Sequence, residues 1–217
     1  MYSIMKIINS VLLSIVLISS VIISISSPVM ADVDTDIRIS IDPTSSTHDS
    51  IVPYEGTMRI TGDRGINYYN FEVIIPKRYT VLFPSRGKTI GTYTMTDLRG
   101  HDKVEIIILS NDSAHDLVDV KYTTNDGHDW RTVRGQNIND MTIGSTNLKL
   151  IKPTLSNPGS LKIDLGSLGP ISRGNIVKFE MEKNTLRNPS RTGTYTWKVN
   201  ARAGPIISSD HIDVRIR

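Results

Sequence analysis

The sequence of 217 residues contains no cysteine, and it has only 4 alanines, 5 glutamates and 3 phenylalanines. Without cysteine, the chain can form no disulfide scaffold, no CxxC zinc site, no iron–sulfur cluster and no thiol nucleophile. Alanine and glutamate favour helix interiors, and their scarcity contrasts with 30 isoleucines, 20 threonines and 15 valines. Because β-branched side chains lose rotamer freedom in a helix and pack well on a pleated sheet, this composition predicts a protein built from strands.

The charges of the chain are nearly balanced, with 25 lysines and arginines against 22 aspartates and glutamates and a net charge of +3. A nucleic-acid-binding domain concentrates positive charge, and an acidic disordered tail concentrates negative charge. Neither pattern is present, so we expect no nucleic acid among the partners of this protein.

Residues 1–31 have the sequence features of an export signal. Residues 1–6 end in a lysine, residues 7–25 carry no charge and are mostly apolar, and the small-residue sequence Val29-Met30-Ala31 follows. This order is typical of a secretory signal peptide and predicts cleavage before Asp32. The alternative is an uncleaved membrane anchor, because residues 7–25 approach the ~20 residues that span a bilayer. In both cases we expect residues 32–217 to be secreted or held at the cell surface, with membrane contact only through residues 7–25.

The rest of the chain has the pattern of short strands. Residues 36–41 and 212–216 alternate strictly between apolar and polar side chains, which predicts strands with one buried and one wet face. Glycine, proline and asparagine residues separate further apolar segments at intervals of roughly 8–12 residues, as in all-β sandwiches. We therefore predict an all-β, immunoglobulin-like β-sandwich of about a dozen short antiparallel strands over residues 32–217. The other expected strands are residues 57–61, 71–75, 79–83, 90–96, 103–109, 117–123, 130–134, 147–151, 161–165, 176–181 and 193–201.

One internal similarity leaves a second domain organisation open. Pro84-Ser-Arg followed by Gly91-Thr-Tyr-Thr resembles Pro189-Ser-Arg followed by Gly193-Thr-Tyr-Thr. The separation of about 100 residues matches the size of one immunoglobulin-like sandwich, so two tandem sandwiches divided near residue 112 are the alternative to one enlarged domain.

The middle of the chain contains a β-hairpin signature with the turn sequence Asn-Asp-Gly between alternating strands. It resembles the Asp-box of sialidase-type propellers and some secreted sandwich domains, which reads Ser/Thr-x-Asp-x-Gly-x-Thr-Trp/Phe. The resemblance implies a folding device in which the acidic position ties the turn and the aromatic packs beneath it. Sialidase activity is not implied, because a propeller needs one box in each blade and the sequence has one. The matching positions are Thr123, Asn125, Gly127, Asp129 and Trp130, with asparagine and aspartate as departures from the pattern.

A second resemblance lies near the C-terminus. Ile171-Ser-Arg-Gly-Asn-Ile-Val-Lys-Phe179, then Asn188-Pro189 and Gly193-Thr-Tyr-Thr-Trp-Lys-Val199, is similar to a phrase in immunoglobulin-like repeats of prokaryotic, especially archaeal, surface and S-layer-type proteins. It implies an extracellular structural or adhesive module.

Residues 111–129, which we call the acidic segment, collect many oxygen donors. Calcium takes six to eight oxygen ligands from loops, but no EF-hand spacing is present, and solvated turn residues remain the alternative. Four of the five histidines precede an aspartate, at residues 48, 101, 115 and 128, without a recognisable metal-ligand spacing. The candidate calcium ligands are Asn111, Asp112, Asp116, Asp119, Asp126 and Asp129.

Catalytic motifs are sparse. The sequence has no Gly-x-Ser-x-Gly elbow, no phosphate loop and no dinucleotide fingerprint, so we expect no enzyme and no cofactor other than the calcium considered above. Trp130, Trp197, Tyr54, Tyr68 and Tyr69 are the aromatic candidates for stacking on a sugar, and we expect both tryptophans to lie in the core and the two adjacent tyrosines to be better exposed.

The sequence therefore predicts an exported, non-enzymatic structural or adhesive module of the cell surface. One route to self-assembly, or to binding other surface proteins, is the addition of a terminal strand, residues 33–41 or 212–217, to the sheet edge of a neighbour. The alternative function is a calcium- or carbohydrate-binding sandwich that takes glycans or calcium at residues 111–130.

Overall fold

The computed structural model describes residues 37–217 except 63–64, 97–102 and 172–173. Residues Val33–Arg217 form one compact unit, which is described here by itself. The expected signal peptide, its cleavage site and the alternative membrane span all lie outside the described residues. Within the described part, no helix has the length and apolar character needed to cross a bilayer.

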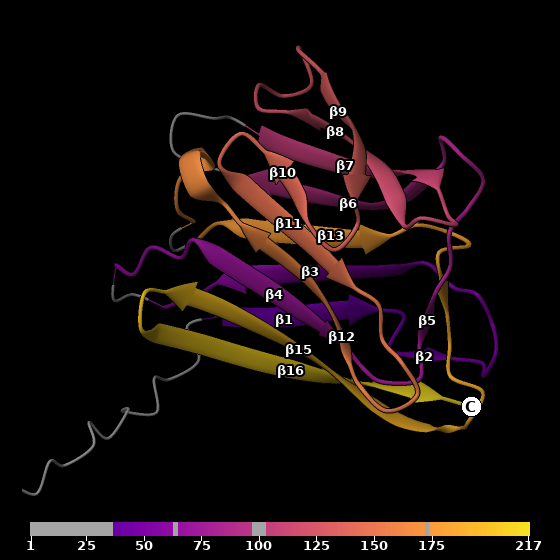
Figure 1. Cartoon of the computed structure of the whole chain (residues 1–217). Helices are drawn as coiled ribbons and strands as arrows, with labels where there is room; N and C mark the ends of the chain where they lie inside the picture. The colour runs from indigo at the N-terminus through magenta and orange to yellow at the C-terminus, as the bar shows by residue number, and fades with distance from the viewer. Residues whose placement is uncertain (1–36, 63–64, 97–102, 172–173) are drawn as a thin grey trace, which may run out of the picture. The chain divides into compact units, whose positions relative to one another are not determined.

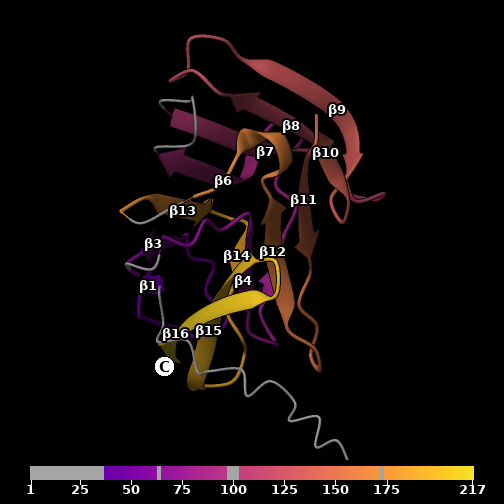
Figure 2. The same cartoon turned by 90° about the vertical axis from the view of Figure 1, so that its left-hand side faces the viewer.

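Two seven-stranded sheets build the fold, and Figures 1 and 2 show them as two layers. Neighbouring strands are antiparallel except for β16 and β2, which pair in parallel. The first sheet has the order β1 (Ile37–Asp42), β3 (Tyr54–Ile60), β13 (Ile176–Met181), β6 (Thr89–Thr96), β7 (Lys103–Asp112), β8 (Leu117–Thr123) and β9 (Arg131–Asn137). The second has the order β10 (Met141–Ile143), β11 (Thr146–Ile151), β12 (Gly159–Asp164), β4 (Asn70–Ile75), β15 (Gly193–Ala203), β16 (Ile206–Ile216) and β2 (Ser45–Ser46).

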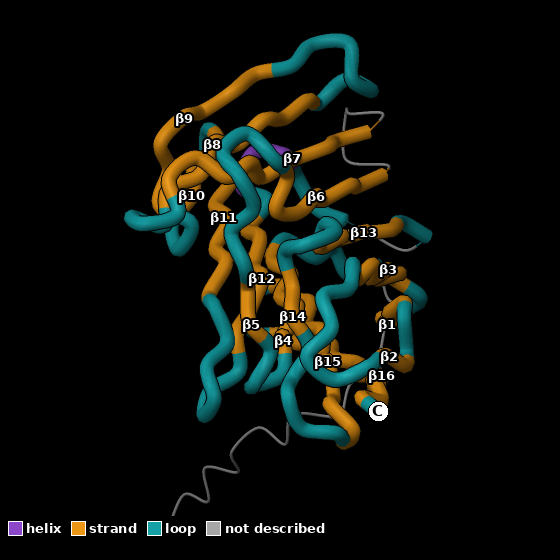
Figure 3. Tube along the Cα trace, turned by 90° about the vertical axis from the view of Figure 1, so that its right-hand side faces the viewer, coloured by secondary structure: helices purple, strands orange, loops and turns teal. Residues whose placement is uncertain are grey.

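The remaining regular elements are short. Strands β14 (Leu186–Arg187) and β5 (Thr80–Val81) form a separate pair, and a 3₁₀ turn covers Gly166–Leu168. In the tube of Figure 3, loops connect nearly all of the strands directly, without intervening helices. The predicted all-β sandwich class, with mostly antiparallel strands, is confirmed.

Alternation of apolar and polar residues explains why these segments form half-buried strands. In β11, Leu148 and Leu150 are buried, whereas Asn147 and Lys149 are exposed. In β3, Tyr54, Met58 and Ile60 are buried in the same way. Each large apolar side chain buried between the two sheets contributes about 1.5–3 kcal/mol, so the core is held without any disulfide.

An aromatic cluster fixes one end of this core. The ring of Trp197 stacks on Tyr54 with a centroid distance of 5.3 Å and meets Tyr79 edge-to-face at 5.4 Å. The Tyr54 hydroxyl donates to Asn188 Oδ1 at 2.7 Å, so burial of this tyrosine leaves no donor unpaired. The expectation that Trp197 lies in the core is confirmed, since the side chain is fully buried.

Both large sheets combine strands from before and after residue 112. In the first sheet β13 lies between β3 and β6, and in the second β4 lies between β12 and β15. Two tandem sandwiches divided near residue 112 would each keep their own sheets, and this arrangement is not observed.

The two terminal strands have different surroundings from those expected. Strand β16 pairs along its whole length with β15, and its end pairs with β2, so residues 212–217 are not a free strand. The backbone N–H of Arg217 donates to Ser46 O, and His48 N–H donates to Arg217 O. The strand is therefore paired with β15 on one side and with β2 at its end, and the addition of residues 212–217 to a neighbouring molecule stays a prediction.

Strand β1 forms the other edge of the first sheet. Its outer side is capped by the second sheet, where Asp210 Oδ2 of β16 accepts a hydrogen bond from Ile39 N–H at 2.9 Å. A carboxylate on the unpaired side of an edge strand discourages pairing with another chain. Residues 37–41 are thus committed within the domain, whereas residues 33–36 lie outside the described residues.

Candidate functional site

The acidic segment does not converge on one point. Asp119 Oδ1 accepts hydrogen bonds from Asn111 Nδ2 at 2.8 Å and from the backbone of Gly135 at 2.9 Å. Asp116 forms an ion pair with Lys152. Asp129 accepts from Asn125 at the hairpin tip. The six candidate calcium ligands therefore divide among separate local networks, and the described residues contain no group of three or more His, Asp or Glu arranged to hold a metal ion.

The adjacent aspartate is the contact of His48 but not of His115. His115 Nδ1 lies 2.8 Å from Asp112 Oδ2, not beside the adjacent Asp116. This contact, together with the backbone N–H of Ala114, lowers the pKa of Asp112. The pair at residues 101–102 lies outside the described residues. These contacts stabilise turns and form no catalytic or metal-binding cluster in the described part of the chain.

The Asp-box-like hairpin is tied by side chains at its turn. Asn125 Oδ1 accepts from the Thr123 hydroxyl and from the backbone N–H of Asp129, both at 2.9 Å. Thr123 Oγ1 in turn accepts from the N–H of Gly127 at 3.2 Å. Trp130 lies against the turn, since its Nε1 is 3.7 Å from the position that a Cβ would take at Gly127, but its side chain is 36% exposed and Lys121 Nζ lies 4.5 Å from its ring centroid. The expectation that Trp130 belongs to the core is wrong.

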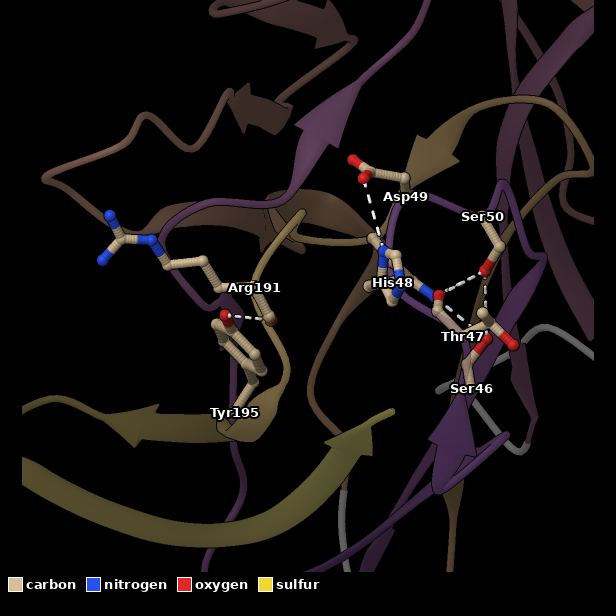
Figure 4. Close-up of polar contacts among 8 residues, drawn as sticks. Ser46, Thr47, His48, Asp49, Ser50, Arg191 and Tyr195 are labelled. Carbon is tan, nitrogen blue, oxygen red and sulfur yellow. Dashed lines mark hydrogen bonds and ion pairs between the residues drawn. The ribbon is translucent and has the colours of Figure 1, made fainter.

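The loop around β2 places histidine, aspartate and serine side by side, which invites comparison with a nucleophilic triad. Figure 4 shows that Ser50 Oγ donates to Thr47 O, at 2.5 Å, and does not face His48. His48 Nδ1 lies 3.4 Å from Asp49 Oδ2, and both side chains are about half exposed. In a triad the hydroxyl of the nucleophile is hydrogen-bonded to the general base, and Ser50 has no such bond to His48, so this loop has no triad geometry. Its polar groups instead anchor Asn188, whose Nδ2 donates to Ser46 and Ser50.

A groove lined by many polar side chains lies on the outer face of the second sheet. Its volume is about 520 Å³, within the ~300–1,000 Å³ of ligand pockets. Strands β11, β12, β4 and β15, which lie side by side in Figure 1, form its floor. We call it the sheet groove. Its lining residues are Asn70, Phe71, Glu72, Asp140, Asn147, Lys149, Lys162, Ile163, Asp164, Asn200 and Arg202.

Strand register arranges the groove side chains in rows across the strands. One row runs Asn147, Asp164, Asn70 and Arg202, each residue directly opposite the next on the neighbouring strand. Directly opposed side chains on one face lie about 4.5–5.5 Å apart. This row therefore presents an amide, a carboxylate, an amide and a guanidinium at regular intervals over four strands.

A second row contains most of the internal ion pairs of the groove. Lys162 Nζ lies 3.0 Å from Glu72 Oε1, and Asn200 Nδ2 donates to Glu72 Oε2 at 3.3 Å. Lys149 lies 3.7 Å from Asp140. The charges of these two ion pairs are already neutralised within the groove, so the pairs hold their side chains in place more than they attract a ligand.

The first row, in contrast, has unused donors. The side chains of Arg202 and Asn70 have no hydrogen bond or ion pair with any residue in the described ranges. Asn147 accepts from Thr142, which leaves its amide N–H groups available, and Asp164 accepts only the N–H of Gly166. The guanidinium offers five N–H groups in a planar fork suited to carboxylates and paired oxygens.

The groove carboxylates are not arranged for acid–base catalysis. Glu72 is held by Lys162 and Asn200, and Asp164 accepts a backbone N–H at the start of a turn. A glycosidase needs one carboxylic acid and one carboxylate free to act on opposite sides of a bond. What this arrangement offers is hydrogen bonding to hydroxyl and carboxylate oxygens.

None of the groove residues was among the sequence candidates. The aromatic candidates lie elsewhere: Tyr68 is buried with its hydroxyl 2.7 Å from Ser208, and Tyr69, just before β4, is 40% exposed. The signal that could have identified the groove is the set of polar residues at the outward positions of β4, β12 and β15. Their meeting depends on which strands pair, and alternation within one strand does not specify this.

Comparisons with known proteins give the following similarities. No protein-family model matches the chain, and no curated protein matches it in sequence. The crystal structure of BslA, a bacterial hydrophobin, is similar with a TM-score of 0.38 and 18% identity over 83% of this chain and 98% of that chain.

Two further solved structures are similar at lower identity. AvmM, which catalyses macrocyclization in alchivemycin A biosynthesis, has a TM-score of 0.33 and 9% identity over 84% of this chain and 89% of that chain. The collagen-binding domain from a Staphylococcus aureus adhesin has a TM-score of 0.32 and 7% identity over 84% of this chain and 97% of that chain. These values are too low to transfer the function of any of the three proteins to this chain.

Proposed function

We propose that this protein is an exported, non-enzymatic surface module with an adhesive role, which binds a hydroxyl-rich polymer, a glycan, in the sheet groove. The observation that carries the proposal is the row of Asn147, Asp164, Asn70 and Arg202, whose amide and guanidinium donors lack partners within the described part of the chain. The export signal predicted for residues 1–31 supports the location at the cell surface or outside the cell.

The chemistry of the row favours a glycan because side-chain amides both donate to and accept from hydroxyl groups, and carboxylates accept from them. Arg202 adds a charged fork, so a sugar that carries a carboxylate fits better than a neutral one. The row lies on paired strands of the sheet and not on loops, so its geometry exists before the ligand arrives and little ordering entropy is lost on binding.

The test compares two substitutions on the same strand. Arg202→Gln removes the groove cation, and Lys198→Gln removes an exposed cation four residues away on the same face of β15, outside the groove. The exported protein is titrated with oligogalacturonate, an acidic sugar oligomer, and with a neutral cello-oligosaccharide by calorimetry.

We expect the wild type to bind the acidic oligomer, and Arg202→Gln to weaken this binding about tenfold or more, because a hydrogen bond to a charged group contributes about 1.5–3 kcal/mol. Lys198→Gln should bind like the wild type. Equal losses in both variants, or no binding of either oligomer by the wild type, would overturn the proposal.

A further inference from the structure

Strand β9 is an open edge of the first sheet. It pairs with β8 on one side and is the last strand of the sheet order, and Figures 1 and 2 show it as the outermost strand at the top of the domain. All seven residues are exposed or half-exposed, in contrast to the alternating burial of the neighbouring β8. The end of β9 is partly covered. Gln136 Oε1 accepts a hydrogen bond from Thr142 N–H, and Asn137 forms an isolated antiparallel β-bridge with Asp140. The uncovered stretch is residues 131–135.

This stretch carries positive charge without compensation on its own strand. Arg131 and Arg134 are exposed, and β9 contains no acidic residue. Neither arginine side chain forms an ion pair with a described residue. Asp119 of β8 does contact the strand, but its Oδ1 already accepts hydrogen bonds from Asn111 and from the backbone of Gly135. An added strand rich in aspartate would therefore meet unpaired cations.

The chain itself contains such a segment. Residues 32–36 read Asp-Val-Asp-Thr-Asp, which alternates acidic and β-branched residues and precedes β1 directly. Its five residues equal the length of the uncovered stretch of β9. We infer that residues 32–36 of one molecule add as a strand to residues 131–135 of a second copy, with backbone hydrogen bonds for affinity and the Asp–Arg contacts for selectivity.

The segment cannot reach β9 of its own molecule. Strands β1 and β9 are the two opposite edges of the same sheet, separated by six inter-strand spacings of ~4.8 Å, or about 29 Å. Five extended residues reach about 17 Å, so pairing within one chain is out of range. A second copy is the occupant that the length allows.

Donor and acceptor on opposite edges give a head-to-tail contact. Such a contact does not close on itself unless the rotation between copies happens to form a ring, so the expected product is an open filament. Pairing of β9 with β9 of a second copy is the competing geometry, but it would bring the arginines of both copies together, and opposed like charges are destabilising.

The test uses the full chain, expressed with its leader, purified after export and checked by mass spectrometry for its N-terminal residue. Assembly is followed by sedimentation velocity and negative-stain electron microscopy over a range of concentrations. The acceptor variant is Arg131→Glu/Arg134→Glu, and the donor variant is Asp34→Lys/Asp36→Lys. Arg215→Glu, an exposed charge reversal on β16, serves as the matched control.

We expect filaments from the wild type and from Arg215→Glu, with weakening near 1 M salt, where exposed charges are screened. Each of the two double variants alone should need about tenfold more protein to assemble, because donor and acceptor then carry the same sign. An equal mixture of the two double variants should assemble again, since each donor meets an acceptor of opposite sign in the other variant.

Three results would overturn the inference. These are a wild type that stays monomeric at every concentration, double variants that assemble like the wild type, and a mixture that fails to recover although both double variants unfold at the wild-type temperature. Groove binding by Arg202 is measured independently of assembly, so the two proposals fail separately.

Discussion

Removal of one buried hydroxyl should stabilise this protein. Tyr93 of β6 is 2% exposed, and its hydroxyl is the buried side-chain polar atom that lacks a hydrogen-bond partner in the described part of the chain. Burial, followed by the nearby charge of Glu72, raises the pKa of Tyr93 well above its ordinary value. A buried hydroxyl without a partner costs about 1–3 kcal/mol, and phenylalanine keeps the ring while removing that group. We therefore expect Tyr93→Phe to raise the free energy of unfolding by about 1 kcal/mol.

The matched control is Tyr54→Phe, which removes a hydroxyl that donates to Asn188 Oδ1 at 2.7 Å. This change leaves a buried acceptor unpaired and should lower the free energy of unfolding by about 1–3 kcal/mol. The change in the free energy of unfolding of each variant is measured by urea titration, with the m-value unchanged from the wild type. For a chain of this size, 1 kcal/mol corresponds to about 2–4 °C in Tm. Loss of more than about 0.5 kcal/mol in Tyr93→Phe would refute the reasoning, because it would show that the hydroxyl makes a favourable interaction.

Three further outcomes follow from the described geometry. Gly56→Ala should cost about 1–3 kcal/mol in urea titrations, because an added Cβ would lie 1.8 Å from Cζ of Phe179 in the core; equal stability would contradict the ring placement. Burial raises the pKa of Tyr54, Tyr79 and Tyr93, so the folded state keeps protons that the unfolded state loses above pH ~10. The contribution of these tyrosines to stability should be constant below that pH, and stability should fall by up to about 4 kcal/mol per pH unit above it. Unfolding at pH 9, 10 and 11 measures this fall, and a flat profile over that range would refute it. Calcium at 1 mM, compared with chelator, should shift the Tm by less than about 2 °C because the acidic segment divides into separate networks, and a larger rise would show a site that these networks rearrange to form.

Much of the fold follows from alternation within each strand. The patterns at residues 36–41 and 212–216 correctly predicted which side chains point inward, because one face of each strand is covered by the opposite sheet. The tendency of tryptophan to be buried fails for Trp130, just before β9, where the residues are exposed on both faces. The strands β2, β10 and β14 were not predicted because two or three residues are too few for a period to appear.

The candidate site depends on long-range pairing, which a single sequence does not contain. Asn70, Asn147, Asp164 and Arg202 come from four segments and meet only because β11, β12, β4 and β15 are neighbours in this register. In the acidic segment the error was the opposite one, because residues that are close in sequence were expected to form one calcium site and do not meet. There, side chains on opposite faces of β7 and β8 and at the hairpin tip point into different surroundings.

The central claim, that the sheet groove binds a glycan, is tested most directly by nuclear magnetic resonance. The groove holds three asparagine side-chain amides, those of Asn70, Asn147 and Asn200, which serve as local probes beside the guanidinium of Arg202. On titration with oligogalacturonate, we predict saturating shifts of these amide signals and of the Arg202 Nε–H signal, with the hairpin at residues 123–130 unchanged. Shifts confined to the hairpin, or no saturable shift in the groove, would contradict the account.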